Sequence, residues 1–398
     1  MALYAEPRAF LLEEEFPHSS PEALALRQVA DNGVDDPPAI RAVDRLHESA
    51  VRLSASDIHL EPTLAGGRVR LRVDGILREI EQLPRELFHP VVSRVKLLAA
   101  MDIAERRLPQ DGRYLLDRGG RNLDARVSSM PTIAGEKLVI RLLDMQAQVP
   151  GLAALGMGVA MLARYRRVIH AAHGFIVVCG PTGSGKTTTL YASLAERNVD
   201  GQHICTVEDP VEVQMTGVAQ VQVNPKAGLT FASALRAFLR QDPNVIMLGE
   251  MRDAESAGVA MSAALSGQLV MTTLHASDAP RAIERLVEFG LDRHTLAAGL
   301  SAIVSQRLVR RLCLHCRSKG CARCDGSGYR GRIAIFEYFP MTSDVRSAVA
   351  RSQTAVELAG LAARSGYEPM IREGFQLVAH GETSRSELER VLGSGNSE

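Results

Sequence analysis

The spacing of hydrophobic positions divides the chain into two regions of ordered elements. In the first region, apolar residues at helical spacing predict helices from 39 to about 54 and from about 87 to 101. Polar and apolar residues alternate from Arg68 to Val73, just before Asp74-Gly75, which predicts a half-buried strand that ends in a tight turn. With further strand-like runs at 122–128 and 137–143, we expect a mixed α/β domain over residues 39–145.

The second region alternates strand and helix patterns. This order favours a parallel sheet with helices on both faces, in a domain that we expect over residues 159–398. The part from 340 to 394 is expected to be helical. The expected strands lie at 175–179, 203–207, 245–248 and 269–274, and the expected helices at 186–197, 230–239 and 254–265.

Two segments lack a clear pattern. Residues 1–38 end in a cluster of turn-forming residues and are expected to be a flexible lead-in. Residues 146–158 are rich in glycine and other small residues, which is typical of a linker between domains.

Composition narrows the class of protein. The chain has 46 lysines and arginines and 46 aspartates and glutamates, so its formal net charge is zero. Proteins that bind nucleic acids are usually basic, so no nucleic-acid partner is expected. No run approaches the ~20 apolar residues that cross a bilayer. The N-terminus carries Glu13, Glu14 and Glu15 and lacks a basic segment, so a secretory signal is not expected. We therefore expect a cytoplasmic protein whose cysteines are thiols or metal ligands.

A glycine-rich motif joins the first strand of the second region to a helix. Its glycines let backbone N–H groups point at phosphates, and the helix N-terminus adds a favourable dipole. We expect Lys186 to reach the β- and γ-phosphates of ATP and Thr187 to bind Mg²⁺ through its hydroxyl. The alternative, a chance glycine-rich turn, is disfavoured by the flanking strand and helix. The predicted nucleotide-binding residues are Gly180, Pro181, Thr182, Gly183, Ser184, Gly185, Lys186, Thr187 and Thr188.

Further polar groups follow the expected strands, at the edge where open α/β sheets bind ligands. We assign Glu250 as the carboxylate that positions the attacking water, with a surface glutamate as the alternative. Glu208 and Asp209, and with less weight Glu212, are expected to hold Mg²⁺ and its waters, although one of them could be a solvated turn charge. His275 has either a γ-phosphate-sensing role or a structural one.

These motifs resemble the secretion ATPases of the GspE/PilB type, which serve type II secretion and type IV pilus assembly. The resemblance runs from about residue 38 to the C-terminus, with the motifs in the order of the family. Besides the glycine-rich loop, the matching segments are SDIHLEP (56–62), DIAERRLPQDGR (102–113), TVEDPVE (206–212), RQDPNVIMLGEMRD (240–253) and TTLHASDAP (272–280).

The resemblance implies a fold and a shared site. It implies an N-terminal mixed α/β (PAS-like) domain, a RecA-like P-loop motor domain and a homohexameric ring. It also implies that Arg126 and Arg141 reach the phosphates from the N-terminal domain; the alternative is an internal ion pair with Asp124 or Asp144. Arg236 and Arg240, one turn apart on an expected helix, are candidates for the site or a subunit contact.

The function that the resemblance implies is ATP hydrolysis that powers assembly of pilin or pseudopilin subunits at the cytoplasmic face of the inner membrane. A pilus-retraction or DNA-uptake motor, and a nucleotide-binding ring component without hydrolysis, are the alternatives. Two departures stand out. Many relatives carry a further N-terminal domain before the matched region, so we expect a short form here. Ala276-Ser277 replaces a Thr-Asn pair that often follows the histidine.

A cysteine cluster lies between 308 and 330. Cys313-x-x-Cys316 and Cys321-x-x-Cys324 offer four thiolates, which suit a closed, structural Zn²⁺ knuckle, with free thiols as the alternative. The basic residues around it form either a solvated surface, a contact with an inner-membrane platform protein or acidic lipid, or a nucleic-acid reader; we favour the partner contact. These residues are Arg307, Arg310, Arg311, Arg317, Lys319, Arg323, Arg330 and Arg332.

Overall fold

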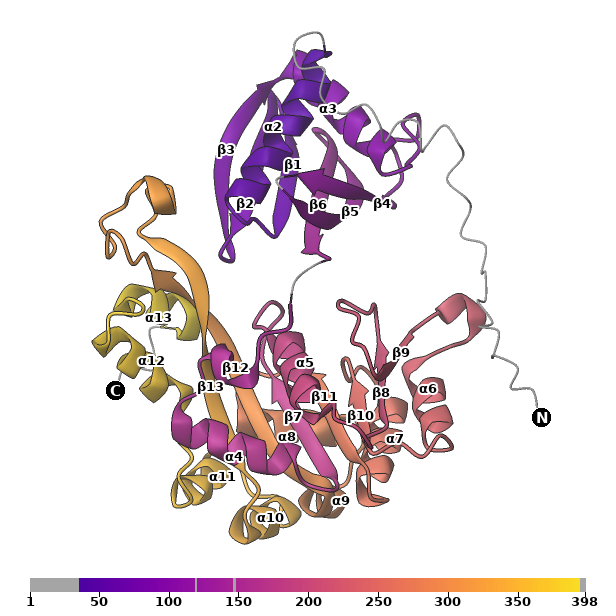
Figure 1. Cartoon of the computed structure of the whole chain (residues 1–398), viewed down its shortest axis with the longest axis vertical. Helices are drawn as coiled ribbons and strands as arrows, with labels where there is room; N and C mark the ends of the chain where they lie inside the picture. The colour runs from indigo at the N-terminus through magenta and orange to yellow at the C-terminus, as the bar shows by residue number, and fades with distance from the viewer. Residues whose placement is uncertain (1–35, 119, 146–147, 394–398) are drawn as a thin grey trace, which may run out of the picture.

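The computed structural model describes residues 36–118, 120–145 and 148–393, which form an N-terminal domain and a larger C-terminal domain (Figure 1). The lead-in expected for residues 1–38 lies outside the described residues except for its last few positions. Within the described ranges, no helix combines the length and the apolar character needed to cross a bilayer.

The described residues of the N-terminal domain form a six-stranded antiparallel sheet with two helices against it. The helices are α2 (Pro38–Arg52) and α3 (Arg85–Leu98), and the strands are β1 (Asp57–Thr63), β2 (Gly66–Val73), β3 (Ile76–Pro84), β4 (Gln110–Arg118), β5 (Arg121–Thr132) and β6 (Gly135–Asp144). The strand order is β3-β2-β1-β6-β5-β4. Alternate residues such as Leu60 and Leu71 are fully buried in one core with Val91 and other residues of the helices. The expected mixed α/β character is confirmed.

The turn between β2 and β3 was predicted from the sequence. Asp74 and Gly75 both have positive φ, 50° and 84°, which is the backbone that a two-residue hairpin turn requires. The sequence pattern did not predict β1, β3 or β4. The first five residues of β1 are all buried, including three polar ones, whereas β3 and β4 each contain a single buried residue.

The C-terminal domain contains a seven-stranded sheet within the described residues. Its strands are β7 (Gly174–Cys179), β8 (Ile204–Glu208), β9 (Val218–Gln222), β10 (Val245–Leu248), β11 (Leu269–Leu274), β12 (Leu300–Leu312) and β13 (Tyr329–Pro340). The order is β13-β12-β7-β11-β10-β8-β9. All neighbours pair in parallel except β12 and β13, which form a long antiparallel hairpin. The expected parallel sheet is therefore confirmed, and the β12–β13 hairpin adds an antiparallel edge that the sequence pattern did not predict.

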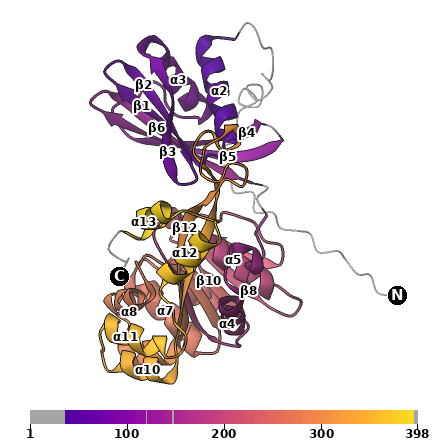
Figure 2. The same ribbon diagram turned by 90° about the vertical axis from the view of Figure 1, so that its left-hand side faces the viewer.

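Helices cover both faces of this sheet, as expected. Phe175 and Val177 of β7 pack into a core with helices α6 to α11, whereas Ile176 and Val178 of the same strand pack on the other face with α4 and α5. Figure 2 shows α10 and α11 on the opposite side of the sheet from α4 and α5. These helices are α4 (Val159–Ile169), α5 (Lys186–Arg197), α6 (Phe231–Phe238), α7 (Ala254–Leu265), α8 (Ala279–Glu288), α9 (Arg293–Gly299), α10 (Ser343–Ala350) and α11 (Ala355–Ala363).

The C-terminal segment is helical, as expected, and packs beside the β12–β13 hairpin. Its last helices are α12 (Met370–Ala379) and α13 (Arg385–Leu392). The segment expected to be a linker behaves differently in its described part, 148–158. Leu152 and Met157 are 1% and 6% exposed and join the core around α4, because their apolar side chains fill space beside the sheet.

Candidate nucleotide site and metal centre

The glycine-rich loop leaves the carboxyl end of β7 and enters α5 at Lys186. Gly183 and Gly185 have φ values of 75° and 87°, a backbone region in which residues with a Cβ atom are strained. The Lys186 ammonium donates to the carbonyl oxygens of Gly180 and Pro181, at 2.9 Å each. Burial lowers the pKa of Lys186, and no carboxylate within 4 Å pairs with it among the described residues. The loop thus holds a buried cation whose hydrogen-bond partners are carbonyl oxygens of the loop itself.

The predicted nucleotide-binding residues lie together in this strand–loop–helix unit. Thr187 is half-buried and Thr188 is exposed in the first turn of α5, where their backbone N–H groups have no partner within the helix. The Ser184 hydroxyl is buried without a hydrogen-bond partner. Nucleotide and Mg²⁺ binding by these residues stay predictions.

Parallel register brings the next polar groups to the same edge. Glu250 follows β10 and His275 follows β11, and the His275 Nε2 atom lies 3.6 Å from the Glu250 carboxylate. Glu250 keeps 25% of its side chain exposed and His275 keeps 52%. A carboxylate that is partly open to solvent beside a phosphate-binding loop can orient a water molecule.

Arg252 is a site residue that the sequence reasoning missed. Its guanidinium forms an ion pair with Glu250 and a second one with Asp209, at 2.9 Å between Nη1 and Oδ2. Although burial opposes it, the hydrogen bonds that Arg252 donates to the Glu250 and Asp209 carboxylates raise the pKa of Arg252. The sequence could have indicated this residue, because Arg252 stands only two positions after Glu250. An arginine so close to the candidate carboxylate was nevertheless given no role.

Glu208 and Asp209 are adjacent in sequence and separate in space. The Asp209 carboxylate joins Arg252 and Glu250 at the exposed edge, whereas Glu208 is 2% exposed. Glu208 accepts hydrogen bonds from the hydroxyls of Tyr191 and Thr206, the latter at 2.5 Å. Burial and the nearby Glu208 carboxylate raise the pKa of Tyr191. Glu208 is therefore tied into the fold, and its metal-holding role stays a prediction.

Arg126 and Arg141 pair within the N-terminal domain. Arg126 Nε lies 3.2 Å from Asp124 Oδ2, and Arg141 Nε lies 3.2 Å from Asp57 Oδ1. Burial and the Glu208 charge raise the pKa of Glu212 in the motor domain, and the charges of Arg126 and Arg141 partly oppose this rise. The contact of the two arginines with phosphate stays a prediction.

The other arginine pair considered from sequence lies at the surface. Arg236 of α6 forms an ion pair with Glu255 at 2.6 Å, and Arg240 donates to the carbonyl of Arg236 at 2.9 Å. Neither contact involves the glycine-rich loop.

The four cysteines of the knuckle converge on one point. Their sulfur atoms all lie within 4.8 Å of one another, with 3.9 Å between Cys313 and Cys321 and 3.6 Å between Cys316 and Cys324. Four sulfurs in tetrahedral coordination around zinc at about 2.3 Å lie roughly 3.8 Å apart, so the cluster fits such an ion. The group could therefore hold a metal ion.

Backbone groups support the cysteine cluster. The N–H groups of Cys321 and Gly328 donate to Cys324 Sγ at 3.2 and 3.3 Å. Although burial raises it, these hydrogen bonds lower the pKa of Cys324 to about 6. Thiolate character is what a metal site needs, because the deprotonated sulfur is the ligand.

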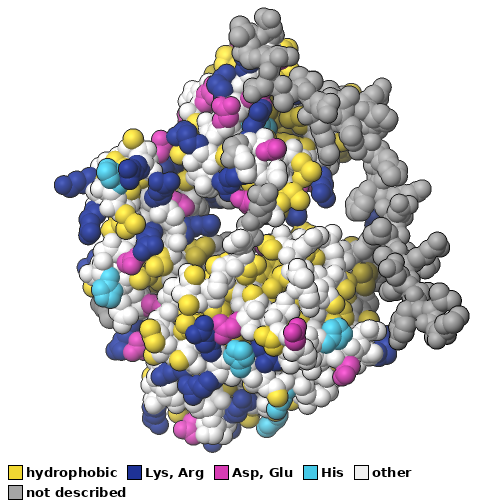
Figure 3. All heavy atoms as spheres, viewed as in Figure 1, with side chains coloured by type: hydrophobic (Ala, Val, Ile, Leu, Met, Phe, Trp, Pro, Cys, Tyr) yellow, Lys and Arg dark blue, Asp and Glu magenta, His cyan; other side chains and the backbone are white. Residues whose placement is uncertain are grey.

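The basic stretch around the knuckle is less uniform than the sequence suggested. Arg310 forms an ion pair with Glu387 of α13 at 2.7 Å and stacks over Tyr329, and Arg311 forms an ion pair with Glu382 at 2.6 Å. These two arginines therefore fix the hairpin to the C-terminal helices. Figure 3 shows Lys and Arg side chains gathered on the side where Figure 1 draws the knuckle. The exposed members are Arg317, Lys319, Arg323, Arg330 and Arg332.

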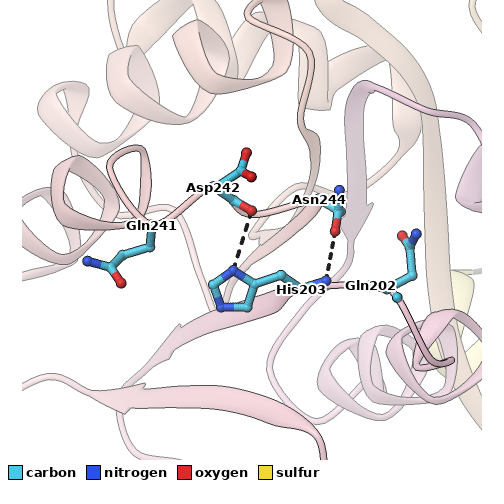
Figure 4. Close-up of a pocket in the computed structure, with 6 residues that line it drawn as sticks. Gln202, His203, Gln241, Asp242 and Asn244 are labelled. Atoms are coloured by element: carbon cyan, nitrogen blue, oxygen red, sulfur yellow. Dashed lines mark hydrogen bonds between the residues drawn. The ribbon is translucent and has the colours of Figure 1, made fainter.

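A hollow lies at the edge of the sheet opposite the glycine-rich loop, at the amino ends of β8 and β10. In Figure 4, His203 points toward Asp242, whose carbonyl lies 3.4 Å from its Nδ1 atom. The backbone N–H of His203 donates to Asn244 Oδ1 at 2.7 Å. Gln202 and Gln241 also line this open, polar hollow. None of the predicted site residues lies here.

The sequence of this chain is similar to those of known proteins. The family described as "Type II/IV secretion system protein" matches residues 32–390. The chain belongs to this family. It is 46% identical to the type II secretion system protein HxcR of Pseudomonas aeruginosa, over 90% of this chain and 78% of that one. It is 41% identical to the type IV pilus assembly ATPase PilB of Myxococcus xanthus, over 90% and 68%.

Solved structures support the fold of this family member. The pilus retraction motor PilT with bound ADP is 25% identical, with a TM-score of 0.61 over 89% of this chain and 97% of that one. The Legionella pneumophila ATPase DotB is 22% identical, with a TM-score of 0.68 over 90% and 97%. The RecA-like motor fold expected from the sequence is confirmed by these likenesses.

Proposed function

We propose that this chain is an ATPase whose turnover drives assembly of pilin or pseudopilin subunits in a type II secretion or type IV pilus machine. The observation that carries the proposal is the meeting of Lys186, Glu250 and His275 at one edge of the motor sheet. The relatives named as type II secretion proteins and as pilus assembly ATPases support it.

The geometry supports in-line attack by water on the γ-phosphate. Lys186 moves from the Gly180 and Pro181 carbonyls to the β- and γ-phosphates. There its positive charge stabilises the negative charge that develops in the transition state. Glu250 orients the water once Arg252 releases it. The Thr187 hydroxyl would hold Mg²⁺, which would supply positive charge to neutralise the phosphates.

The N-terminal domain completes the site in this proposal. Arg126 and Arg141 exchange Asp124 and Asp57 for phosphate when a domain of the same chain or of a neighbouring copy closes on the nucleotide. The side chains are 38% and 64% exposed, so both can leave their partners without unfolding the sheet. A homohexameric ring provides such a neighbouring copy. The domain movements of this ring act on an inner-membrane platform protein from the cytoplasmic face.

The cysteine knuckle holds Zn²⁺ in a structural role. Four thiolates fill a tetrahedral shell, so no position stays open for substrate. Its exposed arginines and lysine offer a positive surface for the partner at the membrane.

The test is steady-state ATP hydrolysis by the purified full chain, with Lys186→Ala as the deciding variant. We expect turnover by the wild type and its loss by at least about 10²-fold in the variant, because the main phosphate cation is removed. Lys226→Ala, an exposed lysine after β9, is the matched control and should hydrolyse ATP like the wild type. Normal turnover by Lys186→Ala would refute the assignment.

A further inference from the structure

Strand β12 lies beside β7 and supports the glycine-rich loop from a distant part of the sequence. Gln306 is 2% exposed, and its Oε1 atom accepts a hydrogen bond from the Thr189 hydroxyl of α5 at 2.7 Å. A Cβ atom on Gly185 would lie 2.8 Å from the Gln306 Nε2 atom, so the strand and the loop are in close contact.

The next residue of β12, Arg307, joins three parts of the site. Its Nη1 atom donates to the Gln306 carbonyl at 3.0 Å, and its Nη2 atom donates to the carbonyl of Ser277. A Cβ atom on Gly180 would lie 3.3 Å from Nη1, so the guanidinium lies against the first glycine of the loop. Ser277 is two residues after His275, so Arg307 bridges the glycine-rich loop and the segment that carries the histidine.

The charge of Arg307 is unusual for a merely structural contact. The side chain is half-buried, and among the described residues no carboxylate lies within ion-pair distance of it. Burial lowers the pKa of Arg307, and its positive charge in turn adds to burial in lowering the pKa of Lys186. A desolvated guanidinium bonded only to carbonyls costs free energy, which a neutral donor at this position would avoid.

We propose that Arg307 is a positioning residue for ATP hydrolysis: by holding the Ser277 carbonyl, it fixes His275 relative to Glu250 and the glycine-rich loop. The inference rests on the proposed ATPase function. It explains how a histidine on an exposed loop keeps its ring nitrogen 3.6 Å from the Glu250 carboxylate. Without Arg307, the loop loses its tie to β12 and the histidine loses a defined position.

The first test compares Arg307→Ala with Arg281→Ala in the full-length protein. Arg281 approaches the same loop, but it donates to the Ser277 side chain at 3.0 Å and leaves the carbonyl free, so it is a matched control. We expect kcat to fall roughly 10- to 100-fold in Arg307→Ala, because a misplaced catalytic group costs about that much. KM for ATP and the affinity for ADP should stay within about twofold, because the phosphate-binding loop is intact. Arg281→Ala should hydrolyse ATP like the wild type.

The second test asks whether Arg307 acts through His275. If it does, the Arg307→Ala/His275→Ala double variant is no slower than His275→Ala alone, whereas independent roles give additive losses. Arg307→Lys should recover most of the lost kcat, because an ammonium can still donate to the Ser277 carbonyl. Additive losses, an unchanged kcat in Arg307→Ala, or a loss of ADP affinity with kcat preserved would each overturn the proposal.

The outcomes separate this inference from the proposed function. If the wild type and Arg281→Ala do not hydrolyse ATP, the ATPase assignment fails. If both hydrolyse ATP and Arg307→Ala matches them, only the positioning role fails. Should Arg307→Ala not fold, Arg307→Met, which keeps an unbranched apolar side chain but donates no hydrogen bond, replaces it in the cycle with His275→Ala.

Discussion

The nucleotide edge and the cysteine knuckle sit on the same β12-containing sheet and are built in opposite ways. At the edge, Lys186 bonds to carbonyls of its own loop and Glu250 pairs with Arg252, so each group has a partner that substrate can replace. In the knuckle, four sulfurs lie within 4.8 Å of one another, and backbone N–H groups donate to Cys324 Sγ. In the proposed function, the first region exchanges its contacts during turnover, and the second region keeps them.

The largest expected effect comes from removing the water-orienting carboxylate. Glu250→Gln should lower kcat by about 10²- to 10³-fold while ATP binding persists, because the amide cannot orient water as a carboxylate does. Steady-state hydrolysis and nucleotide titration measure the two effects separately.

Glu284→Gln is the control for this prediction, since Glu284 is an exposed glutamate of α8 away from the edge. An unchanged rate in Glu250→Gln would remove Glu250 from its role. The nucleotide edge would then depend on another carboxylate, with Asp209 as the next candidate because it shares Arg252.

The second effect tests the knuckle. Cys321→Ser/Cys324→Ser should abolish bound zinc and make the segment between β12 and β13 sensitive to protease, because the loop loses its cross-link. Hydrolysis should fall by less than in Glu250→Gln, since no cysteine of the knuckle joins the nucleotide edge. Metal analysis and limited proteolysis measure the change.

Cys205→Ser is the matched control, because this buried thiol of β8 lies outside the knuckle and the variant should keep its zinc. Two outcomes would contradict separate roles for the nucleotide edge and the cysteine knuckle. One is zinc retained by the double cysteine variant, and the other is ATP hydrolysis by this variant as slow as that of Glu250→Gln.

The smallest effect concerns the contact that secures the hairpin. Glu387 is 1% exposed; although burial opposes it, hydrogen bonds from Arg390 and Arg310 lower its pKa to about 2. A carboxylate with a lowered folded-state pKa stabilises the fold fully above its usual pKa of 4.5, and this contribution is lost as pH falls from 4.5 toward 2. Glu387→Gln should therefore cost on the order of 3 kcal/mol at pH 7 and roughly half of that at pH 3.

Chemical unfolding at the two pH values measures this difference, and ATP hydrolysis at pH 7 should change little. Glu389→Gln is the control and should shift stability by less than about 1 kcal/mol, because Glu389 forms a solvent-exposed ion pair with Arg385. Equal losses for Glu387→Gln at both pH values would contradict the ionised pair.

Local patterns predicted the central motor elements well. The bounds of α5, α7, β10 and β11 agree with the sequence prediction, because buried strands and flanking helices carry their signal in consecutive residues. The β12–β13 hairpin was missed as a strand pair. Arginines interrupt its apolar pattern, and the partner that neutralises Arg310 lies in α13, far along the sequence.

The site shows the same limit at the level of single side chains. The meeting of Glu250 and His275 followed from strands that end at one edge. The inward direction of Glu208 did not, because it depends on Tyr191, a residue of α5 whose hydroxyl has no sequence signal. Arg252 was given no role, and Arg307 was grouped with the basic residues around the knuckle, because the contacts of both side chains run between separate strands and loops.

The distribution of cysteines has a practical consequence for measuring motion. Cys179 and Cys205 are buried, and burial raises the pKa of both thiols, that of Cys179 to about 12. The other four thiols converge on the knuckle, where zinc would mask them. A single cysteine introduced at an exposed position is therefore expected to be the main target of a maleimide dye, so domain movements can be followed by fluorescence without first removing the native thiols.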